Sequence, residues 1–130
     1  GLLPTLLELA GLPHDGVEGV SLADSLRRGN EPPRRPIISE IAFGYQGWRD
    51  HDRQAMVRDG DWKLSLFTAP QDPARFAANP DGSLYHLRRD PNESANLFAS
   101  PPAQVHRRRL ERAIVDWDAS RLAATANTRP

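Results

Sequence analysis

The 130-residue chain contains no cysteine, one methionine and one lysine, Lys63. Disulfide bonds and thiolate metal sites are therefore excluded, and the redox state of the compartment cannot be read from the sequence. Apolar runs stay far below the roughly 18 residues of a membrane span, and no signal peptide is visible. We expect no membrane partner. A bacterial cytoplasm and a periplasm both remain open as locations.

The chain also lacks an excess of charge of either sign, because 17 basic residues face 17 acidic ones. This balance argues against a general polyanion binder, and we expect no nucleic-acid partner. Almost all basic residues are arginine, whose guanidinium group suits sulfate, phosphate and carboxylate. Many alanines and prolines accompany them, which is typical of a GC-rich genome, and we favour this second explanation of the bias.

Two short helices are predicted in residues 1–29. Apolar residues recur at helical spacing and predict a helix over residues 4–10, ended by Gly11 and Pro13. Ser21 is a suitable N-cap for a second helix over residues 22–28. The first helix is so apolar that it must lie against a large surface. The apolar positions are Leu2, Leu3, Leu6, Leu7 and Ala10.

Residues 36–98 predict a sheet. Four segments have strand composition, namely 36–43, 54–58, 61–67 and 83–88. Asp59-Gly60 separates the middle two and is a strong hairpin signal, because both residues tolerate positive φ.

A helix over residues 100–123 follows the sheet, with Ser100 as its N-cap. Its predicted apolar face consists of Val105, Leu110, Ala113, Ile114 and Trp117. This order of elements predicts an α+β fold, a small antiparallel sheet of about four strands packed against a C-terminal helix.

One loop has the composition of a ligand site. Residues 48–53 combine Trp48, Arg49, His51 and Arg53, a set that suits an anionic or sugar-like ligand. The alternative is a solvated loop whose charges compensate one another. The four histidines show no metal-ligand spacing, and no catalytic or metal-binding residue is identified.

The segment Asp90-Pro91-Asn92-Glu93 holds two carboxylates that could bind a metal or transfer protons. We favour a structural role, in which Asp90 accepts backbone N–H groups in a turn, Pro91 fixes the next φ and Glu93 faces water. Asn96 then links the turn to the sheet, and Leu97 enters the core. A basic run over residues 107–109 could bind nucleic acid or another anion. Acidic residues interrupt that helix at Glu111, Asp116 and Asp118, so a solvated face is favoured.

Three segments resemble the sulfatase family in the expected order. Residues 83–97 (SLYHLRRDPNESANL) are similar to a "LYDL..DP.E..NL" signature near the C-terminal end of sulfatases. Residues 3–13 (LPTLLELAGLP) resemble a "PTLLDLAG" helix, and residues 16–22 (GVEGVSL) resemble the "G.DG.SL" turn after it. The resemblance extends over roughly residues 2–29, 53–67 and 83–117.

The resemblance implies an enzyme similar to alkaline phosphatases, with a formylglycine made from a C/S-x-P-x-R motif and a Ca²⁺ or Mg²⁺ ion. That motif and the metal-binding Asp clusters are absent here, so no catalytic residue, metal ligand or cofactor is assigned to this chain. Residues 1–130 are expected to form a single C-terminal sulfatase-like subdomain. Residues 1–29 would pack on the missing N-terminal catalytic domain, and Leu2, Leu3, Leu6 and Leu7 would favour self-association without it.

By position, residues 45–53 are the candidate rim of the substrate cleft. Two other functions stay open. Some phosphonate and phosphate monoester hydrolases share the family pattern, and a stand-alone interaction domain could reuse the fold.

Overall fold

The computed structural model describes residues 1–42, 53–68, 76 and 82–126. Contacts divide the chain into two compact units, Gly1–Arg34 and Arg35–Pro130, and each is described by itself. No helix within the described ranges is long and apolar enough to cross a membrane.

The first unit contains helices α1 (Leu2–Leu9) and α2 (Ala23–Arg28). Thr5 joins its two halves, because its Oγ1 accepts the Leu22 N–H at 2.9 Å and donates to the Gly1 carbonyl at 2.6 Å. Helix α2 begins one residue later than predicted. Leu22 occupies the N-cap position, and the Ser21 hydroxyl accepts the Ala23 N–H instead.

The apolar side chains of α1 are largely in water. Leu2 is 77% exposed, Leu3 57% and Leu6 53%, while Leu7 is half-buried. Leu9 is also exposed. Apolar surface of this kind is stabilised when another surface removes it from water.

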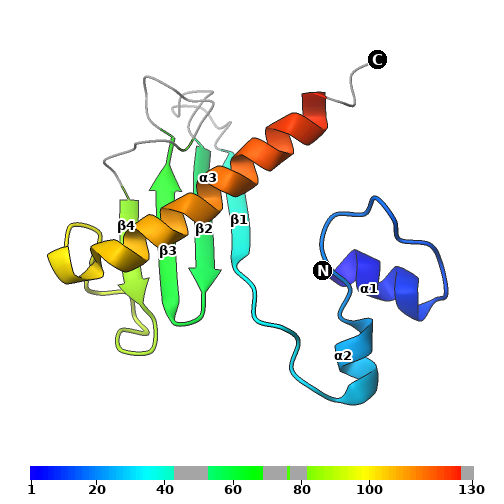
Figure 1. Ribbon diagram of the computed structural model, residues 1–130. Coiled ribbons are helices and arrows are strands. Elements are labelled where there is room, and N and C mark those ends of the chain that lie inside the picture. The colour runs from blue at the N-terminus through cyan, green and yellow to red at the C-terminus, as the bar shows by residue number, and fades with distance from the viewer. Residues whose placement is uncertain (43–52, 69–75, 77–81, 127–130) are drawn as a thin grey trace. The chain divides into compact units, whose positions relative to one another are not determined.

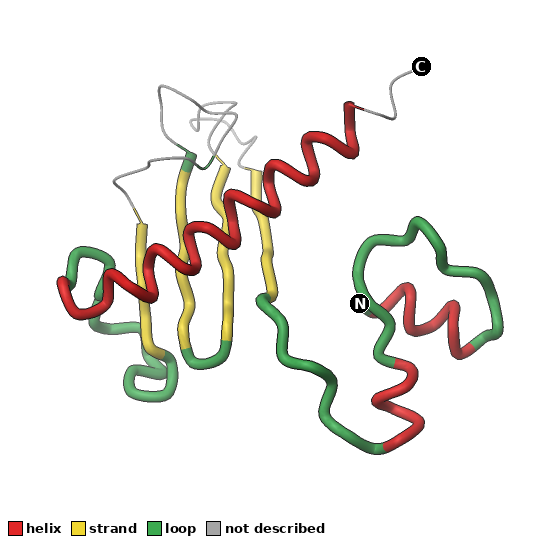
Figure 2. The backbone as a smooth tube through the Cα atoms, viewed as in Figure 1, coloured by secondary structure: helices red, strands yellow, loops and turns green. Residues whose placement is uncertain are grey.

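The second unit is built on a sheet in the order β1-β2-β3-β4, antiparallel throughout (Figure 1). The strands are β1 (Ile37–Ala42), β2 (Arg53–Asp59), β3 (Trp62–Phe67) and β4 (Gly82–His86). Gly60, at φ 60°, closes the predicted β2–β3 hairpin, seen as the short turn in Figure 2. The hairpin prediction is confirmed.

Helix α3 (Gln104–Ala126) crosses one face of the sheet after a short 3₁₀ turn, η1 (Pro101–Ala103) (Figure 1). Successive strand residues point to opposite faces, so each strand sends alternate side chains toward α3. Val57, Leu64 and Leu84 meet Leu110 and Ile114 there, and all five are at most 1% exposed. The predicted α+β class is confirmed.

Two details of the last helix differ from the prediction. Val105 was expected in the core and is 62% exposed, whereas Asp118 was expected in solvent and is 3% exposed. The face that packs on the sheet instead follows a spacing of four residues, from the half-buried His106 through Leu110 and Ile114 to Asp118. Asp118 tolerates burial because it is paired with a cation, as described below.

The N-terminal end of this helix also differs from the prediction. Ser100 lies at the N-cap of η1, but its side chain makes no capping hydrogen bond. The Gln104 amide ties this end of the helix to the preceding turn instead, donating to the Phe98 and Ser100 carbonyls.

Candidate functional site

A network of four charged side chains occupies one end of the sheet beneath α3. Arg53, the first residue of β2, donates through Nε to Glu40 Oε1 at 2.5 Å and through Nη2 to Asp118 Oδ1 at 2.9 Å. Arg121 lies 2.8 Å from the second oxygen of Glu40. The network therefore links the neighbouring strands β1 and β2 to α3, which lies far from both in sequence.

Arg53 is protonated in this setting. Burial disfavours its charged form, but hydrogen bonds to Asp118 and Glu40 outweigh that cost, and the net pKa is raised above its ordinary value. The guanidinium also lies over the Phe76 ring, with Cζ 4.7 Å from the centroid. Phe76 is 2% exposed. The charge is thus held between two carboxylates and an aromatic face.

The same end of the sheet carries both ends of residues 43–52, because β1 ends at Ala42 and β2 begins at Arg53. The backbone N–H of Arg53 donates to Thr68 Oγ1 at 3.1 Å, and the Thr68 N–H donates to the Arg53 carbonyl at 2.9 Å. The point at which this segment rejoins the sheet is therefore fixed by main-chain and side-chain contacts together.

Only one of the predicted site residues falls within the described part of the chain. Arg53 is part of the ion network, so its guanidinium holds protein carboxylates. Trp48, Arg49 and His51 lie outside the described residues.

The network partners of Arg53 were not identified from sequence. Glu40 stands in an apolar strand, where a lone carboxylate signals a buried partner. Asp118 lies four residues after Ile114, one helical turn later, and this spacing could have predicted that it faces the sheet.

The two carboxylates of the Asp-Pro turn have structural roles. Asp90 accepts hydrogen bonds from the Ser94 and Ala95 N–H groups at 3.0 and 2.9 Å and from the Ser94 hydroxyl at 2.8 Å. These bonds, the one from the Ala95 N–H foremost, lower the pKa of Asp90. Glu93 accepts from Lys63 Nζ at 2.8 Å. The turn interpretation is confirmed for Asp90, whereas Glu93, which was expected to face water, pairs with Lys63 instead.

Asn96 links this turn to the sheet, as predicted. Its Oδ1 accepts the N–H groups of Leu84 and Phe98, each at 3.0 Å, and its Nδ2 donates to the Gly82 carbonyl at 3.2 Å. Leu97 packs against the edge of the core.

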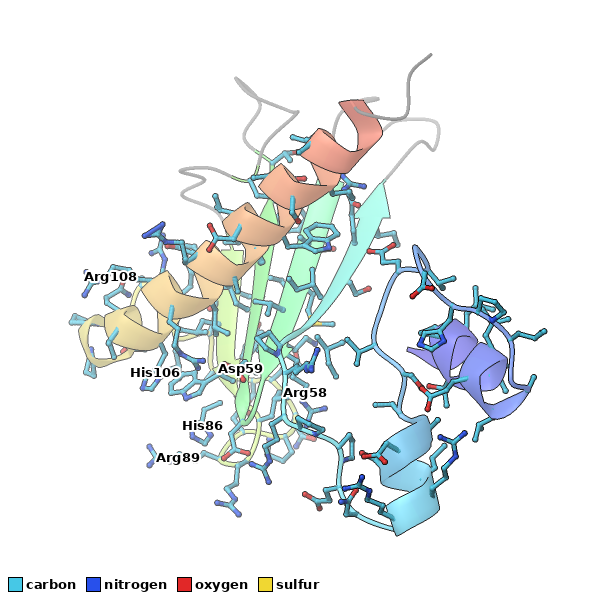
Figure 3. All side chains as sticks on the ribbon, turned by 45° about the vertical axis from the view of Figure 1, so that its right-hand side comes forward. Arg58, Asp59, His86, Arg89, His106 and Arg108 are labelled. Carbon is cyan, nitrogen blue, oxygen red and sulfur yellow. The ribbon has the colours of Figure 1, made fainter. Side chains whose placement is uncertain are left out.

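The hairpin end of the sheet gathers aromatic rings and charges. Trp62 stacks on His106 of α3, with ring centroids 4.2 Å apart, and meets the edge of His86 at 4.8 Å. Figure 3 labels both histidines near Asp59, which pairs with Arg109. The Trp62 ring is thus covered by two imidazoles and packs against the core.

Within the described ranges, no group of three or more His, Asp or Glu side chains is placed to hold a metal ion. These residues do not fit the divalent ion that the sulfatase resemblance implies. The contacts of Arg53 with Glu40, Asp118 and Thr68 instead brace the end of the sheet at which β2 begins.

No family model matches the chain, but solved structures do. A protein of Bacteroides thetaiotaomicron assigned to the sulfatases matches 99% of this chain with 26% of its own, at 25% identity and a TM-score of 0.68. A 2-O GAG sulfatase matches the same shares at 25% identity and a TM-score of 0.64. A phosphonate monoester hydrolase of Agrobacterium radiobacter matches 90% of the chain with 24% of its own, at 25% identity and a TM-score of 0.66. The chain therefore spans about a quarter of the length of the proteins that it matches.

Proposed function

Since the chain has the subdomain fold of alkaline phosphatase-like sulfatases, we propose that it is the non-catalytic C-terminal part of an enzyme that hydrolyses sulfate esters. One observation carries the proposal: 99% of the chain aligns with about a quarter of two sulfatase structures. The nucleophile and the metal would then belong to the rest of the protein. In this proposal they are a formylglycine and a Ca²⁺ or Mg²⁺ ion in an N-terminal catalytic domain.

The exposed leucines of α1 support a missing partner. Leu2, Leu3 and Leu6 are each more than half exposed on a helix of eight residues. A catalytic domain of the same protein would remove them from water. A stand-alone interaction domain, the second class of function, would leave this helix face in water or cover it with a different protein.

The second part of the proposal concerns the substrate cleft. Residues 45–53, with Trp48, Arg49 and His51, would form part of its rim. The support is indirect: Arg53 ends this segment, and its bonds to Glu40 and Asp118 brace the strand from which the segment leaves. Pairing of Arg53 within the protein leaves Arg49 and His51 as the proposed contacts with an anionic substrate.

A related phosphonate or phosphate monoester hydrolase is the alternative activity. It is favoured by the similarity to the phosphonate monoester hydrolase of Agrobacterium radiobacter. Sulfate monoesters, phosphate monoesters and phosphonate monoesters all place charged oxygens around a tetrahedral centre, so the fold of this part cannot distinguish them.

The experiment is to express the complete reading frame and to assay it with aryl sulfate, aryl phosphate and aryl phosphonate esters. Faster turnover of the sulfate ester supports the first activity, and faster turnover of a phosphorus ester supports the alternative. Replacing Arg49 and His51 by alanine in that protein tests the rim. An unchanged kcat/KM on the best substrate would contradict it.

A further inference from the structure

Arg53 contacts both chain connections at its end of the sheet. It is the residue at which the connection from β1 ends and β2 begins. Its main chain forms two hydrogen bonds with Thr68, where the connection from β3 to β4 begins. Its guanidinium lies over the ring of Phe76, which is buried farther along that same connection. One residue therefore fixes points on two connections that are separate in sequence.

Helix α3 is held by the same guanidinium. Asp118 of the helix accepts a hydrogen bond from Nη2, and Glu40 of β1 accepts one from Nε. Arg121, three residues further along α3, binds the second oxygen of Glu40. The side chains of Arg53, Glu40 and Asp118 are 16%, 17% and 5% exposed, so water screens their interactions weakly. The position of Arg53 is thus coupled to that of the helix.

The hairpin end of the sheet is built differently. There β2 and β3 are joined by the short turn at Gly60, seen in Figure 2. The nearby ion pair of Lys63 with Glu93 has side chains 28% and 34% exposed, so solvent weakens it. The buried ion network therefore lies at the end of the sheet where residues 43–52 and 69–81 connect the strands, and not at the end closed by the tight turn.

A buried ion network is a costly way to secure the end of a sheet. Its charges lose their hydration, and apolar side chains of similar volume often give equal or greater stability. The network does supply a defined geometry, because the planar guanidinium directs its N–H groups along fixed directions. Arg53 can bond Glu40 and Asp118 and cover Phe76 at the same time only within a narrow range of positions. The arrangement therefore indicates that the position of this end of the sheet matters beyond its stability.

Resting on the proposed function, we infer that Arg53 is a positioning residue for substrate binding by the complete enzyme. Its guanidinium is engaged by protein carboxylates, so it acts on the substrate through other residues. It fixes the point at which the proposed rim, residues 45–53, rejoins the sheet, and hence the placement of Arg49 and His51. Poor placement weakens contacts that hold the anionic ester in the ground state and the transition state alike, which raises KM and leaves kcat nearly unchanged.

Steady-state kinetics of the complete protein test this inference, with whichever aryl sulfate, phosphate or phosphonate ester it hydrolyses fastest. KM does not depend on the fraction of molecules that are folded, whereas the apparent kcat does. Arg53→Met should raise KM several-fold, and Arg53→Lys, which keeps the charge but not the planar fork, should raise it less. Lys63→Met, which breaks an ion pair at the hairpin end, should leave KM unchanged.

The result that overturns the inference is a KM equal to that of the parent in both Arg53 variants, even where their kcat or melting temperature falls. If Arg53→Met does not fold, Arg53→Lys alone decides by the same criterion. A rise in KM for Lys63→Met as large as that for the Arg53 variants also overturns the inference, because the effect would then not be specific to this end of the sheet.

A combined variant tests the route through the rim. In a protein that already carries Arg49→Ala and His51→Ala, Arg53→Lys should raise KM no further, because no contact remains for Arg53 to position. An undiminished effect in that background contradicts the inference. A complete protein that hydrolyses none of the three esters overturns the proposed function and this inference together, whereas unchanged KM values in an active protein overturn only the inference.

Discussion

Arg53 and Asp118 are joined across 65 residues of sequence by a hydrogen bond of 2.9 Å between Nη2 and Oδ1. Asp118 is 3% exposed, so this bond lies in a part of the molecule that water does not reach freely. It holds the start of β2 against α3, at the end of the sheet where residues 43–52 rejoin it. The stability of that end depends on the pair.

Asp118→Asn should lower the free energy of unfolding by about 2 kcal/mol, within the range for hydrogen bonds to charged groups. The loss stays moderate because Glu40 still pairs with Arg53. Urea unfolding measures it. Asp116→Asn is the matched control, since Asp116 is exposed on the same helix. Equal losses from the two variants would show that the network contributes little.

Asn96→Ala should destabilise the fold by roughly 1–3 kcal/mol, because it leaves the buried Leu84 N–H without its acceptor. Asn96→Asp keeps that acceptor, but a carboxylate oxygen would face the Gly82 carbonyl oxygen in place of the amide donor, so part of the stability should still be lost. Thermal unfolding compares them with Asn92→Ala, an exposed residue of the same turn. An unaltered melting temperature for Asn96→Ala would rule out this role.

Asp90 should make stability depend on pH. Its pKa in the folded chain lies below the ordinary value of 3.8 because backbone and hydroxyl groups bind the carboxylate. The resulting stabilisation is present above pH 3.8 and is lost as the pH falls through the lower, folded pKa.

Asp90→Asn should therefore be less stable than the parent at about pH 5, and the difference should shrink at about pH 2. Denaturant unfolding at both values measures this. Asp61→Asn, at an exposed position, is the control. A difference for Asp90→Asn that does not change with pH would contradict the assignment.

Gly82→Ala should disturb the junction of β4 with the core. A Cβ at this position would lie 2.6 Å from Cε2 of Phe98 and 2.7 Å from the Ser65 carbonyl oxygen. Because one of these neighbours is backbone, the strand must shift, at a cost of roughly 1–3 kcal/mol. Ser83→Ala, the next residue of β4, is the control. Chemical denaturation that finds Gly82→Ala as stable as the parent would refute the clash.

Helix α1 should make the isolated chain associate. Replacing Leu3 and Leu6 by glutamate should shift sedimentation toward the monomer, because both leucines are more than half exposed. The control replaces Leu12 and Val20, exposed apolar residues of the same unit that lie outside the helix. If both double variants sediment alike, α1 has no special part in association.

Short sequence motifs were sufficient to predict much of the structure of the second unit. Asp59-Gly60 predicted the hairpin, because its backbone preference acts within four residues. Asp90 and Asn96 were placed correctly, since their partners lie in the same turn or in the adjoining strand.

Interactions across long sequence separations were harder to predict. Asp118 was assigned to solvent because its partner Arg53 lies 65 residues away, and nothing beside Asp118 indicates a cation. Val105 was assigned to the core because it is apolar and lies five residues before Leu110, within the spacing of the predicted apolar face. The position of α3 on the sheet, fixed by Leu110 and Ile114, decided otherwise. The predicted rim residues Trp48, Arg49 and His51 stay a prediction.

The most direct test of the account compares sulfate-ester hydrolysis by the complete reading frame with that by the 130-residue chain, using an aryl sulfate with Ca²⁺ or Mg²⁺ present. If the chain is the non-catalytic part of a sulfatase, as proposed, the complete protein hydrolyses the ester and the short chain does not. Turnover by the short chain alone, or a complete protein that hydrolyses no sulfate ester, would contradict the central claim.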